Sequence, residues 1–151
     1  MNDLERYWVE TGLALAIEAH KGQVDKAGEP YFLHFMRVGM AFKEAKKMTL
    51  GFIHDVLEDT TITADDLRAA GLPEDIIRGA IAISKVRGES NDAYLSRVEK
   101  DDLARPVKIV DLKDNSNLKR LKVVTEKDLA RQEKYKKSIA RLIAYTLDSQ
   151  L

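Results

Sequence analysis

The apolar residues of this chain recur at helical spacing along almost its entire length. Near the N-terminus, Trp8, Leu15 and Ala19 fall on one face of a helix. Two later segments, Thr63 to Asp66 and Thr125 to Asp128, have the Ser/Thr-x-x-acid form that caps the N-termini of helices. This pattern predicts an all-α fold.

Short segments that contain glycine, proline or polar residues separate the expected helices. These helices cover approximately residues 4–20, 31–47, 49–57, 63–71, 73–84, 92–101, 103–117 and 125–147. Val107, Ile109 and Val110 would also suit a β-strand, but the sequence offers no second strand to pair with them. We therefore expect one all-α domain, residues 1–151, with about seven or eight helices.

The composition excludes several classes of function. Apolar residues make up 44% of the chain and charged residues 33%, which is typical of a globular protein and not of a disordered one. The 25 basic and 25 acidic residues give a formal net charge of zero, so we expect no nucleic-acid or membrane partner. Because cysteine is absent, a metal would have to be held by His, Asp or Glu.

A cytoplasmic location is the default expectation, because the sequence shows no signal peptide and no membrane-spanning run. MNDLERYWVE lacks the basic start and the apolar run of a signal peptide. No apolar run approaches the roughly 20 residues that span a bilayer.

Tyr7 and Trp8 suit either a homo-oligomer contact or packing in the core, so both alternatives stay open.

The segment GFIHDVLEDT, residues 51–60, places polar side chains in an apolar frame. On a continuous helix, His54 aligns with Glu58 and Asp55 aligns with Asp59, because residues four apart share a face. Buried carboxylates must pair, become protonated or bind a cation. Imidazole with carboxylates suits Mn²⁺, Zn²⁺ or Fe²⁺. The alternative is a strip that faces solvent or caps the next helix, and the segment by itself offers only two metal ligands.

Further ligand candidates lie elsewhere in the chain. His34 occurs in the apolar stretch PYFLHFMRV, where a histidine is more often a core residue than a ligand. His20 lies at a helix C-terminus, where the helix dipole is a sufficient explanation. Asp111 follows the apolar run PVKIV, so it can point inward, or it can lie in a turn or on an exposed helical face.

Three segments, in this order, resemble motifs of the RelA/SpoT-type HD hydrolases. AHKGQVDKAGEPYFLHFMRV resembles AHKGQ-x-RK-x-GEPY-x-x-HP-x-x-V, GFIHDVLEDT resembles LLHDVVEDT, and VKIVDLKDNSNLKRL resembles VKLADRLHNLRTL. The resemblance covers about residues 10 to 120, and the length of the chain is similar to that of the small stand-alone hydrolases without a synthetase domain. It implies an HD-domain helical bundle.

The resemblance also implies a cofactor and a reaction. One divalent metal, typically Mn²⁺, is expected with the ligands His34, His54, Asp55 and Asp111. Glu58 and Asp59 match the acidic pair that activates and positions water in this family. The implied reaction converts the small-molecule nucleotides ppGpp and pppGpp to GDP or GTP and pyrophosphate.

Several residues match the substrate contacts of the family. Lys26 corresponds to the lysine of the RK pair, Asn115 to an asparagine that lines the nucleotide site, and Tyr135 to a tyrosine beside the nucleotide. Lys21 and Lys113 are further candidates for offsetting phosphate charge, although both could equally be ordinary surface lysines.

The chain departs from the family pattern where the substrate is expected to bind. Asp25 replaces the arginine that helps to hold the base, and Phe35 replaces the proline after the first histidine ligand. Asp114 and Asn117 replace a histidine and an arginine that follow the ligand aspartate, and the loop ISKVRGESND also differs. An acid in place of a base-holding cation indicates altered specificity.

Three functions therefore remain after the sequence analysis. The first is hydrolysis of (p)ppGpp. The second is hydrolysis of another nucleotide, such as ppApp, NADPH or a nucleoside phosphate, by the same fold and metal. The third is a metal- or nucleotide-binding module without catalysis, which ranks last because Glu58 and Asp59 are both present.

Overall fold

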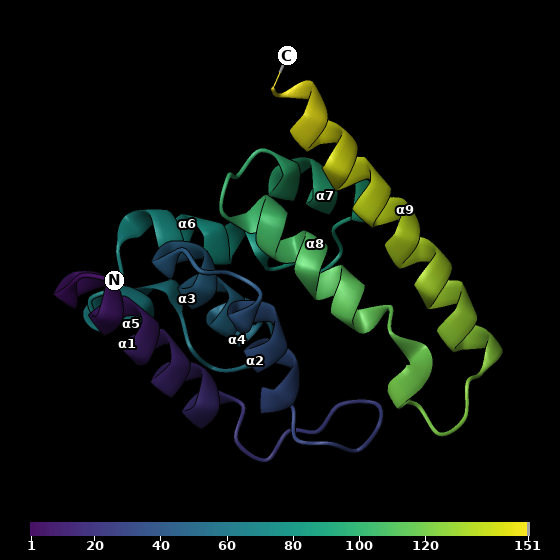
Figure 1. The fold of residues 1–151 in the computed structure, drawn as a ribbon, viewed down its shortest axis with the longest axis horizontal. Coiled ribbons are helices and arrows are strands. Elements are labelled where there is room, and N and C mark those ends of the chain that lie inside the picture. The colour runs from purple at the N-terminus through teal and green to yellow at the C-terminus, as the bar shows by residue number, and fades with distance from the viewer. Residues whose placement is uncertain (151) are drawn as a thin grey trace.

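The computed structural model describes residues 1–150, and the described chain is built from α-helices (Figure 1). The prediction of an all-α fold is confirmed. Between residues 1 and 150 there is no β-strand, only an isolated antiparallel bridge between Val24 and Pro30. The helices are α1 (Asp3–Ala19), α2 (Phe32–Met40), α3 (Ala45–Ile53), α4 (Val56–Asp59), α5 (Ala64–Ala69), α6 (Glu74–Ile83), α7 (Asn91–Glu99), α8 (Ala104–Asn115) and α9 (Glu126–Asp148), with a 3₁₀ turn η1 (Leu118–Arg120) before α9.

The single helix expected over residues 31–47 is divided in two. Helix α2 ends at Met40 and α3 begins at Ala45, after Glu44 adopts an extended conformation with φ −71° and ψ 131°. Lys46 and Lys47 lie in the first turn of α3, where the helix dipole does not favour positive charge. The positive charge of Lys46 is compensated by an ion pair with Asp75, in which Nζ lies 2.5 Å from Oδ2.

The helix expected over residues 49–57 is also interrupted. Helix α3 ends at Ile53 and the short α4 begins at Val56, so His54 and Asp55 occupy the turn between them. Asp59 still lies one turn beyond Asp55, and its backbone N–H donates to the Asp55 carbonyl at 2.9 Å. His54 and Asp55 therefore lie at the junction of two helices, and the polar side chains of this segment do not share one continuous helix face.

Helix α3 occupies the centre of the fold. It contacts α1, α2, α6 and α8, and its side chains Leu50, Phe52 and Ile53 are fully buried. Helices α2 and α3 approach closely because glycines face each other: a Cβ atom on Gly51 would lie 2.6 Å from the Cα of Gly39. This close approach brings the first turn of α2 next to the end of α3, where the polar residues gather.

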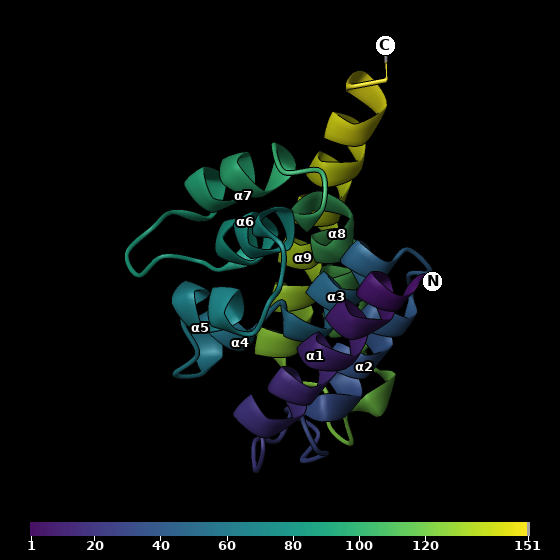
Figure 2. The same cartoon turned by 90° about the vertical axis from the view of Figure 1, so that its left-hand side faces the viewer.

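The C-terminal part of the chain packs α9 against α8, while the loop between α1 and α2 extends toward the end of α8 (Figures 1 and 2). Thr63 and Thr125 cap α5 and α9 in capping boxes with Asp66 and Asp128, as the sequence predicted. Helix α9 is amphipathic and charged, and none of the helices between residues 1 and 150 is both long and apolar enough to cross a membrane.

The aromatic residues near the N-terminus have separate environments. Trp8 is partly buried and packs against the core, with the Lys46 ammonium 5.6 Å from the centre of its ring. Tyr7 is half exposed, and its hydroxyl donates to the Ala70 carbonyl at 2.5 Å. Core packing therefore explains Trp8, and homo-oligomer formation stays a prediction.

Candidate metal and substrate site

Four side chains from three parts of the fold converge in the interior. His34 comes from the first turn of α2, His54 and Asp55 from the α3–α4 junction, and Asp111 from the second half of α8. One nitrogen or oxygen atom from each residue lies within 4.8 Å of all the others, and three of the four residues are buried. The four residues that the sequence analysis expected to act together are thus neighbours. We call them the His/Asp cluster.

Both imidazole rings present the same nitrogen to the centre of the cluster. The His54 Nδ1–H donates to the Gly51 carbonyl at 2.7 Å, and the His34 Nδ1–H donates to Asp114 Oδ2 at 2.7 Å. The two Nε2 atoms then face each other at 3.2 Å. With Nδ1 protonated, each Nε2 carries a lone pair in the neutral ring, as a metal ligand requires.

Asp111 contacts both histidines of the cluster and two polar side chains outside it. Its Oδ1 lies 3.0 Å from His34 Nε2 and 3.2 Å from His54 Nε2. Lys108 Nζ donates to its Oδ2 at 2.9 Å, and Asn115 Nδ2 donates to Oδ1 at 3.1 Å. Burial opposes ionisation, but Lys108 and His54 outweigh it and hold the pKa of Asp111 well below its usual range.

Asp55 completes the cluster beside a tyrosine. Its Oδ2 lies 3.1 Å from His54 Nε2, and it accepts a hydrogen bond from the hydroxyl of Tyr31. Burial and the Asp55 charge raise the pKa of Tyr31, so this hydroxyl stays a donor. Tyr31 was not among the predicted site residues, although it precedes His34 by one helical turn within the first motif.

The chemistry of the cluster fits a divalent cation. Two imidazole nitrogens and two carboxylate groups, without a thiolate, are ligands that Mn²⁺, Zn²⁺ and Fe²⁺ accept. Burial lowers the pKa of His34 and of His54, but the neighbouring carboxylates more than offset it and raise both above the usual range. Positive charge is therefore favoured at the centre of the His/Asp cluster, and a bound divalent cation would supply it.

Glu58 and Asp59 lie next to the cluster in different environments. Glu58 Oε1 accepts a hydrogen bond from the Lys85 backbone N–H at 2.6 Å, which ties it to the segment after α6. Burial, Asp55 and Glu58 raise the pKa of Asp59 to about 6. The roles of both acids stay predictions, but Asp59 has the pKa of a group that can exchange a proton near neutral pH.

We expect Asp59 to make stability depend on pH in the metal-free protein. Its pKa is about 6 in the folded chain, against about 3.9 for an unfolded aspartate. The folded state binds this proton more tightly, so the stabilisation that protonation provides is full below about pH 4 and is lost as pH rises through about pH 6. Asp59→Asn should therefore stabilise the metal-free protein at pH 8 by about 1 kcal/mol, after allowance for solvent screening.

Urea unfolding of the metal-free wild type and of Asp59→Asn, at pH 8 and at about pH 4, measures this effect. The gain from the substitution should shrink at the lower pH. An equal gain at both pH values would contradict the raised pKa.

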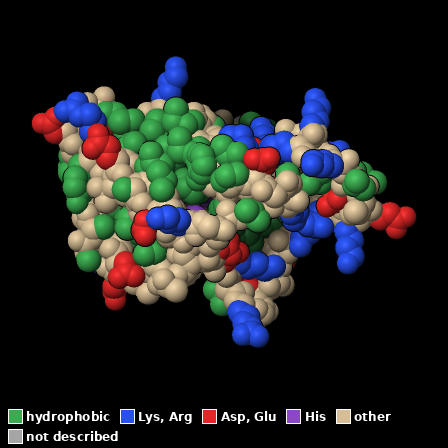
Figure 3. Space-filling view, turned by 90° about the horizontal axis from the view of Figure 1, so that it is seen from below, with side chains coloured by type: hydrophobic (Ala, Val, Ile, Leu, Met, Phe, Trp, Pro, Cys, Tyr) green, Lys and Arg blue, Asp and Glu red, His purple; other side chains and the backbone are tan. Residues whose placement is uncertain are grey.

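A cavity of about 290 Å³ lies beside the cluster. Among its lining residues are the predicted substrate contacts Lys26, Asn115 and Tyr135. Tyr31 and Asn115 connect it to the cluster through their hydrogen bonds to Asp55 and Asp111. We call it the main cavity. It also contains Arg120 and Arg131, and basic side chains gather near η1 and the start of α9 (Figure 3).

A second, smaller cavity of about 130 Å³ shares Tyr135 with the main cavity. Glu58, Lys85, Lys108 and Lys134 contribute to its wall. Lys108 is largely buried, with its ammonium 5.3 Å from the centre of the Tyr94 ring. Lys108 was missed in the sequence analysis; the available signal was its position three residues before Asp111, on the same helix face.

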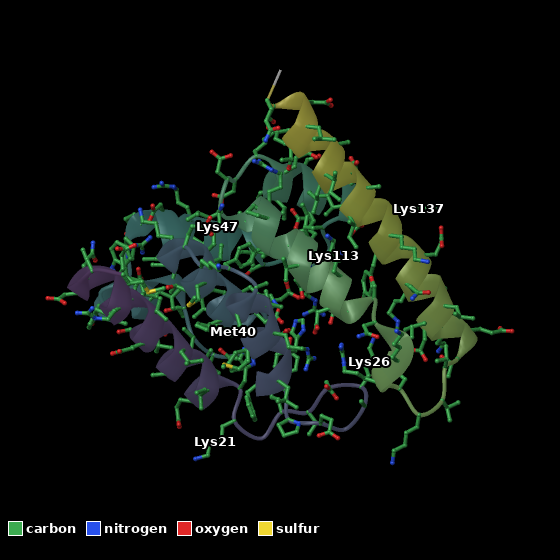
Figure 4. All side chains as sticks on the ribbon, in the orientation of Figure 1. Lys21, Lys26, Met40, Lys47, Lys113 and Lys137 are labelled. Atoms are coloured by element: carbon green, nitrogen blue, oxygen red, sulfur yellow. The ribbon has the colours of Figure 1, made fainter. Side chains whose placement is uncertain are left out.

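Lys21 and Lys113, the other lysine candidates, line neither cavity. Lys21 points away from the body of the protein, whereas Lys26 lies beside the end of α8 (Figure 4). Asp25 lies in the wall of the main cavity, and its Oδ1 accepts hydrogen bonds from the backbone N–H groups of Ala27 and Glu29, both at 2.9 Å. Asp25 therefore stabilises the loop that carries Lys26.

The chain has an all-helical HD-type fold, and its His/Asp cluster could hold a metal ion. A solved structure described as a metazoan ortholog of SpoT that hydrolyses ppGpp has the same fold, with a TM-score of 0.74, 17% identity, and coverage of 89% of this chain and 84% of that one. The likeness to this structure shows the fold. No protein-family model matches the chain.

Comparison with curated proteins confirms the resemblance that the motifs predicted: the chain is similar to SpoT/RelA-type proteins. A Mycoplasma pneumoniae protein named a probable guanosine-3′,5′-bis(diphosphate) 3′-pyrophosphohydrolase is 28% identical over 156 aligned residues, which cover 87% of this chain. A Myxococcus xanthus protein named a GTP pyrophosphokinase is 28% identical over 96 residues, or 61% of the chain. The chain spans 21% of the length of the first relative and 12% of the second.

Proposed function

We propose that this chain is a metal-dependent guanosine-3′,5′-bis(diphosphate) 3′-pyrophosphohydrolase, which converts ppGpp or pppGpp to GDP or GTP and pyrophosphate. The observation that carries the proposal is the buried His/Asp cluster joined to the main cavity through Tyr31 and Asn115. A nucleotide in this cavity would have its phosphates next to the only centre, among the described residues, where two histidines and two aspartates converge.

His34, His54, Asp55 and Asp111 are proposed to hold the cation. The resemblance to RelA/SpoT-type hydrolases makes Mn²⁺ the expected ion, and the nitrogen and oxygen ligands would also suit Zn²⁺ or Fe²⁺. When bound, such an ion supplies a nucleophilic water at neutral pH and offsets phosphate charge. The chain prepares this site in advance, since Gly51 and Asp114 orient the two rings, and Lys108 and Asn115 hold the Asp111 carboxylate.

Glu58 and Asp59 are proposed to position the attacking water and to accept its proton. A proton acceptor works best when its pKa is near the operating pH, and the pKa of Asp59 is raised to about 6. Glu58 is fixed by the Lys85 N–H and faces the smaller cavity, where it can orient water beside the scissile bond. The bond between the 3′-oxygen and phosphorus breaks, water supplies an oxygen to pyrophosphate, and a proton goes to the 3′-oxygen.

The two cavities suggest how the substrate is bound. Tyr135 offers a ring on which the base can stack, and Lys26, Arg120 and Arg131 supply positive charge around the main cavity. In the smaller cavity, Lys85, Lys108 and Lys134 can offset the charge of a phosphate group. Lys21 and Lys113 are not included, because neither lines a cavity.

Hydrolysis of another nucleotide by the same site is the second candidate, and Asp25 is the observation that favours it. A carboxylate lies in the cavity wall where the family pattern has a base-holding arginine. Because a carboxylate accepts hydrogen bonds and does not donate them, it selects bases by a different set of contacts. ppApp, NADPH and nucleoside phosphates are the compounds to compare.

Pyrophosphate release from ppGpp with added Mn²⁺ is the test of this proposal. ppApp, NADPH and nucleoside monophosphates form the comparison panel, and formation of pppGpp from GTP and a pyrophosphate donor is measured in parallel. We expect turnover of ppGpp that stops on chelation and returns when Mn²⁺ is restored.

The outcomes separate the candidates. If ppGpp were not turned over but another panel member were, that nucleotide would become the proposed substrate, and the metal-dependent mechanism would be retained. Absence of turnover across the panel, in protein that binds Mn²⁺, would contradict the enzymatic proposal and favour a binding module.

A further inference from the structure

Asp114 contacts His34 on the side opposite the His/Asp cluster. Its Oδ2 lies 2.7 Å from His34 Nδ1, while His34 Nε2 lies 3.0 Å from Asp111 Oδ1. Asp111 and Asp114 are three residues apart on α8, so they share a helix face and reach the two nitrogens of one ring. Helix α8 therefore holds His34 at both of its polar atoms.

The contact with Asp114 determines which nitrogen of His34 carries the proton. An ionised carboxylate accepts hydrogen bonds and cannot donate, so Nδ1 must be the donor. The neutral ring then has its lone pair on Nε2, which points toward Asp111 and His54. A carboxylate behind a histidine ligand fixes the ring orientation and increases its basicity toward a metal.

Two arginines hold the Asp114 carboxylate in place. Arg37 donates from Nε to Oδ1 at 2.7 Å and from Nη2 to Oδ2 at 3.1 Å, in a two-point contact. Arg120 donates from Nη2 to the Asp114 carbonyl at 2.7 Å and approaches Oδ2 at 3.4 Å. Burial opposes ionisation, but His34 and Arg37 outweigh it and hold the pKa of Asp114 well below its usual range.

The two histidines of the cluster are supported unequally. His54 Nδ1 donates to a neutral backbone carbonyl, that of Gly51, whereas His34 Nδ1 donates to a charged carboxylate. The RelA/SpoT-type pattern has a histidine at the position of Asp114, and a neutral histidine cannot provide the same negative charge. The departure from the family pattern at Asp114 therefore changes the group that contacts Nδ1 of one proposed metal ligand, His34.

We propose that Asp114 is a positioning residue for the metal site, which orients His34 through Nδ1 and strengthens its binding to a divalent cation. Arg37 and Arg120 are part of the same unit, because they fix the carboxylate. Since Arg120 also lines the main cavity, the unit extends from the metal ligand to the wall of the proposed substrate site. The inference rests on the proposed function only for the existence of the metal site, not for the identity of the substrate.

Titration with Mn²⁺, followed by calorimetry, tests the proposal without measuring turnover. Asp114→Ala removes the acceptor, and we expect the dissociation constant for Mn²⁺ to rise by roughly 10- to 100-fold. Asp114→Asn retains an oxygen that can accept from Nδ1 but lacks the charge, so its dissociation constant should lie between those of Asp114→Ala and the wild type.

Glu99→Ala is a matched control. Glu99 is also a partly buried carboxylate with a two-point contact to an arginine: Arg141 Nε lies 3.1 Å from Oε2 and Nη2 lies 3.5 Å from Oε1. Its side chain is 16% exposed, against 12% for Asp114. Loss of an equivalent ion pair away from the cluster should leave Mn²⁺ affinity unchanged.

Nuclear magnetic resonance of the ¹⁵N-labelled, Zn²⁺-loaded protein gives a second measurement. In the wild type we expect a slowly exchanging proton on His34 Nδ1 and none on Nε2. In Asp114→Ala this proton should exchange rapidly with solvent, while the proton on His54 Nδ1 should be unaffected. If Asp114 contributed only to the overall stability of the protein, its replacement would not change proton exchange at one histidine selectively.

Unchanged Mn²⁺ affinity in a folded Asp114→Ala or Asp114→Asn protein would overturn the proposal. An equal loss of affinity in Glu99→Ala would do the same, because the effect would then reflect stability alone. If the wild type failed to bind Mn²⁺ or Zn²⁺, the metal site and this inference would both be wrong. If it bound metal but did not hydrolyse ppGpp, only the proposed substrate would fail.

Discussion

Asp111→Asn is expected to abolish tight metal binding and, with it, hydrolysis. Asp111 contacts both histidines of the cluster, and it also pairs with Lys108 and Asn115. The substitution retains the shape of the side chain but removes the negative charge that a cation requires. The fall in Mn²⁺ affinity should exceed the roughly 100-fold that loss of an outer partner costs.

A second consequence of Asp111→Asn concerns Lys108. Burial lowers the pKa of Lys108, but the Asp111 carboxylate more than offsets this and raises it above the usual value. Without that carboxylate the ammonium loses its partner in a largely buried position, and breaking a buried ion pair typically costs about 3–5 kcal/mol. We therefore expect a lower free energy of unfolding, measured with urea in the absence of metal.

Asp102→Asn is the control for Asp111→Asn. Asp102 lies just before α8, its side chain is 94% exposed, and it pairs with Arg105 at the surface. Its replacement should change neither Mn²⁺ affinity nor pyrophosphate release. If Asp111→Asn bound Mn²⁺ as tightly as the wild type, the assignment of Asp111 as a ligand would be wrong.

Glu58→Gln is expected to reduce kcat by about 10²- to 10⁴-fold, the usual contribution of a positioned proton-transfer group. Glutamine can still accept the Lys85 N–H bond through its side-chain oxygen, so the local structure should be retained. Because Glu58 is not one of the four cluster residues, Mn²⁺ affinity should be unchanged. The two measurements together distinguish loss of water activation from loss of metal.

Glu89→Gln provides the matched control for Glu58→Gln. Glu89 also accepts a backbone N–H in the segment after α6, that of Val86 at 3.1 Å, and it lines neither cavity. Its replacement should leave kcat within the error of the wild type. Similar losses in both variants would indicate a disturbed loop and would remove Glu58 from the proposed mechanism.

The helices were largely predictable because their signals are local. The capping boxes at Thr63 and Thr125 and the helical spacing of apolar residues depend on neighbours a few positions apart. The breaks at 41–44 and at 54–55 were not predictable from these signals. They arise from long-range packing, since α2 must turn back over α3 and the glycine contact between Gly39 and Gly51 sets their spacing.

The candidate site shows the same division. The motifs indicated His34, His54, Asp55 and Asp111 before any geometry was available, and the structure places them within reach of one cation. Lys108 and Tyr31 have no distinguishing local pattern, and each gains its importance from one contact with a cluster aspartate. In the sequence, Asp114 is recognisable only as a departure from the family pattern, whereas the fold places it beside Nδ1 of His34.

By itself, the sequence determined the helical class, the order of the motifs and the types of ligand, because residue chemistry and short-range spacing are properties of the chain. The tertiary structure decided which side chains meet. It placed Nδ1 of His34 2.7 Å from Oδ2 of Asp114, although the two residues are 80 positions apart in the chain. It also brought the α1–α2 loop, the end of α8 and α9 together around the main cavity. Such contacts depend on the packing of α2, α3 and α8, which no local segment specifies.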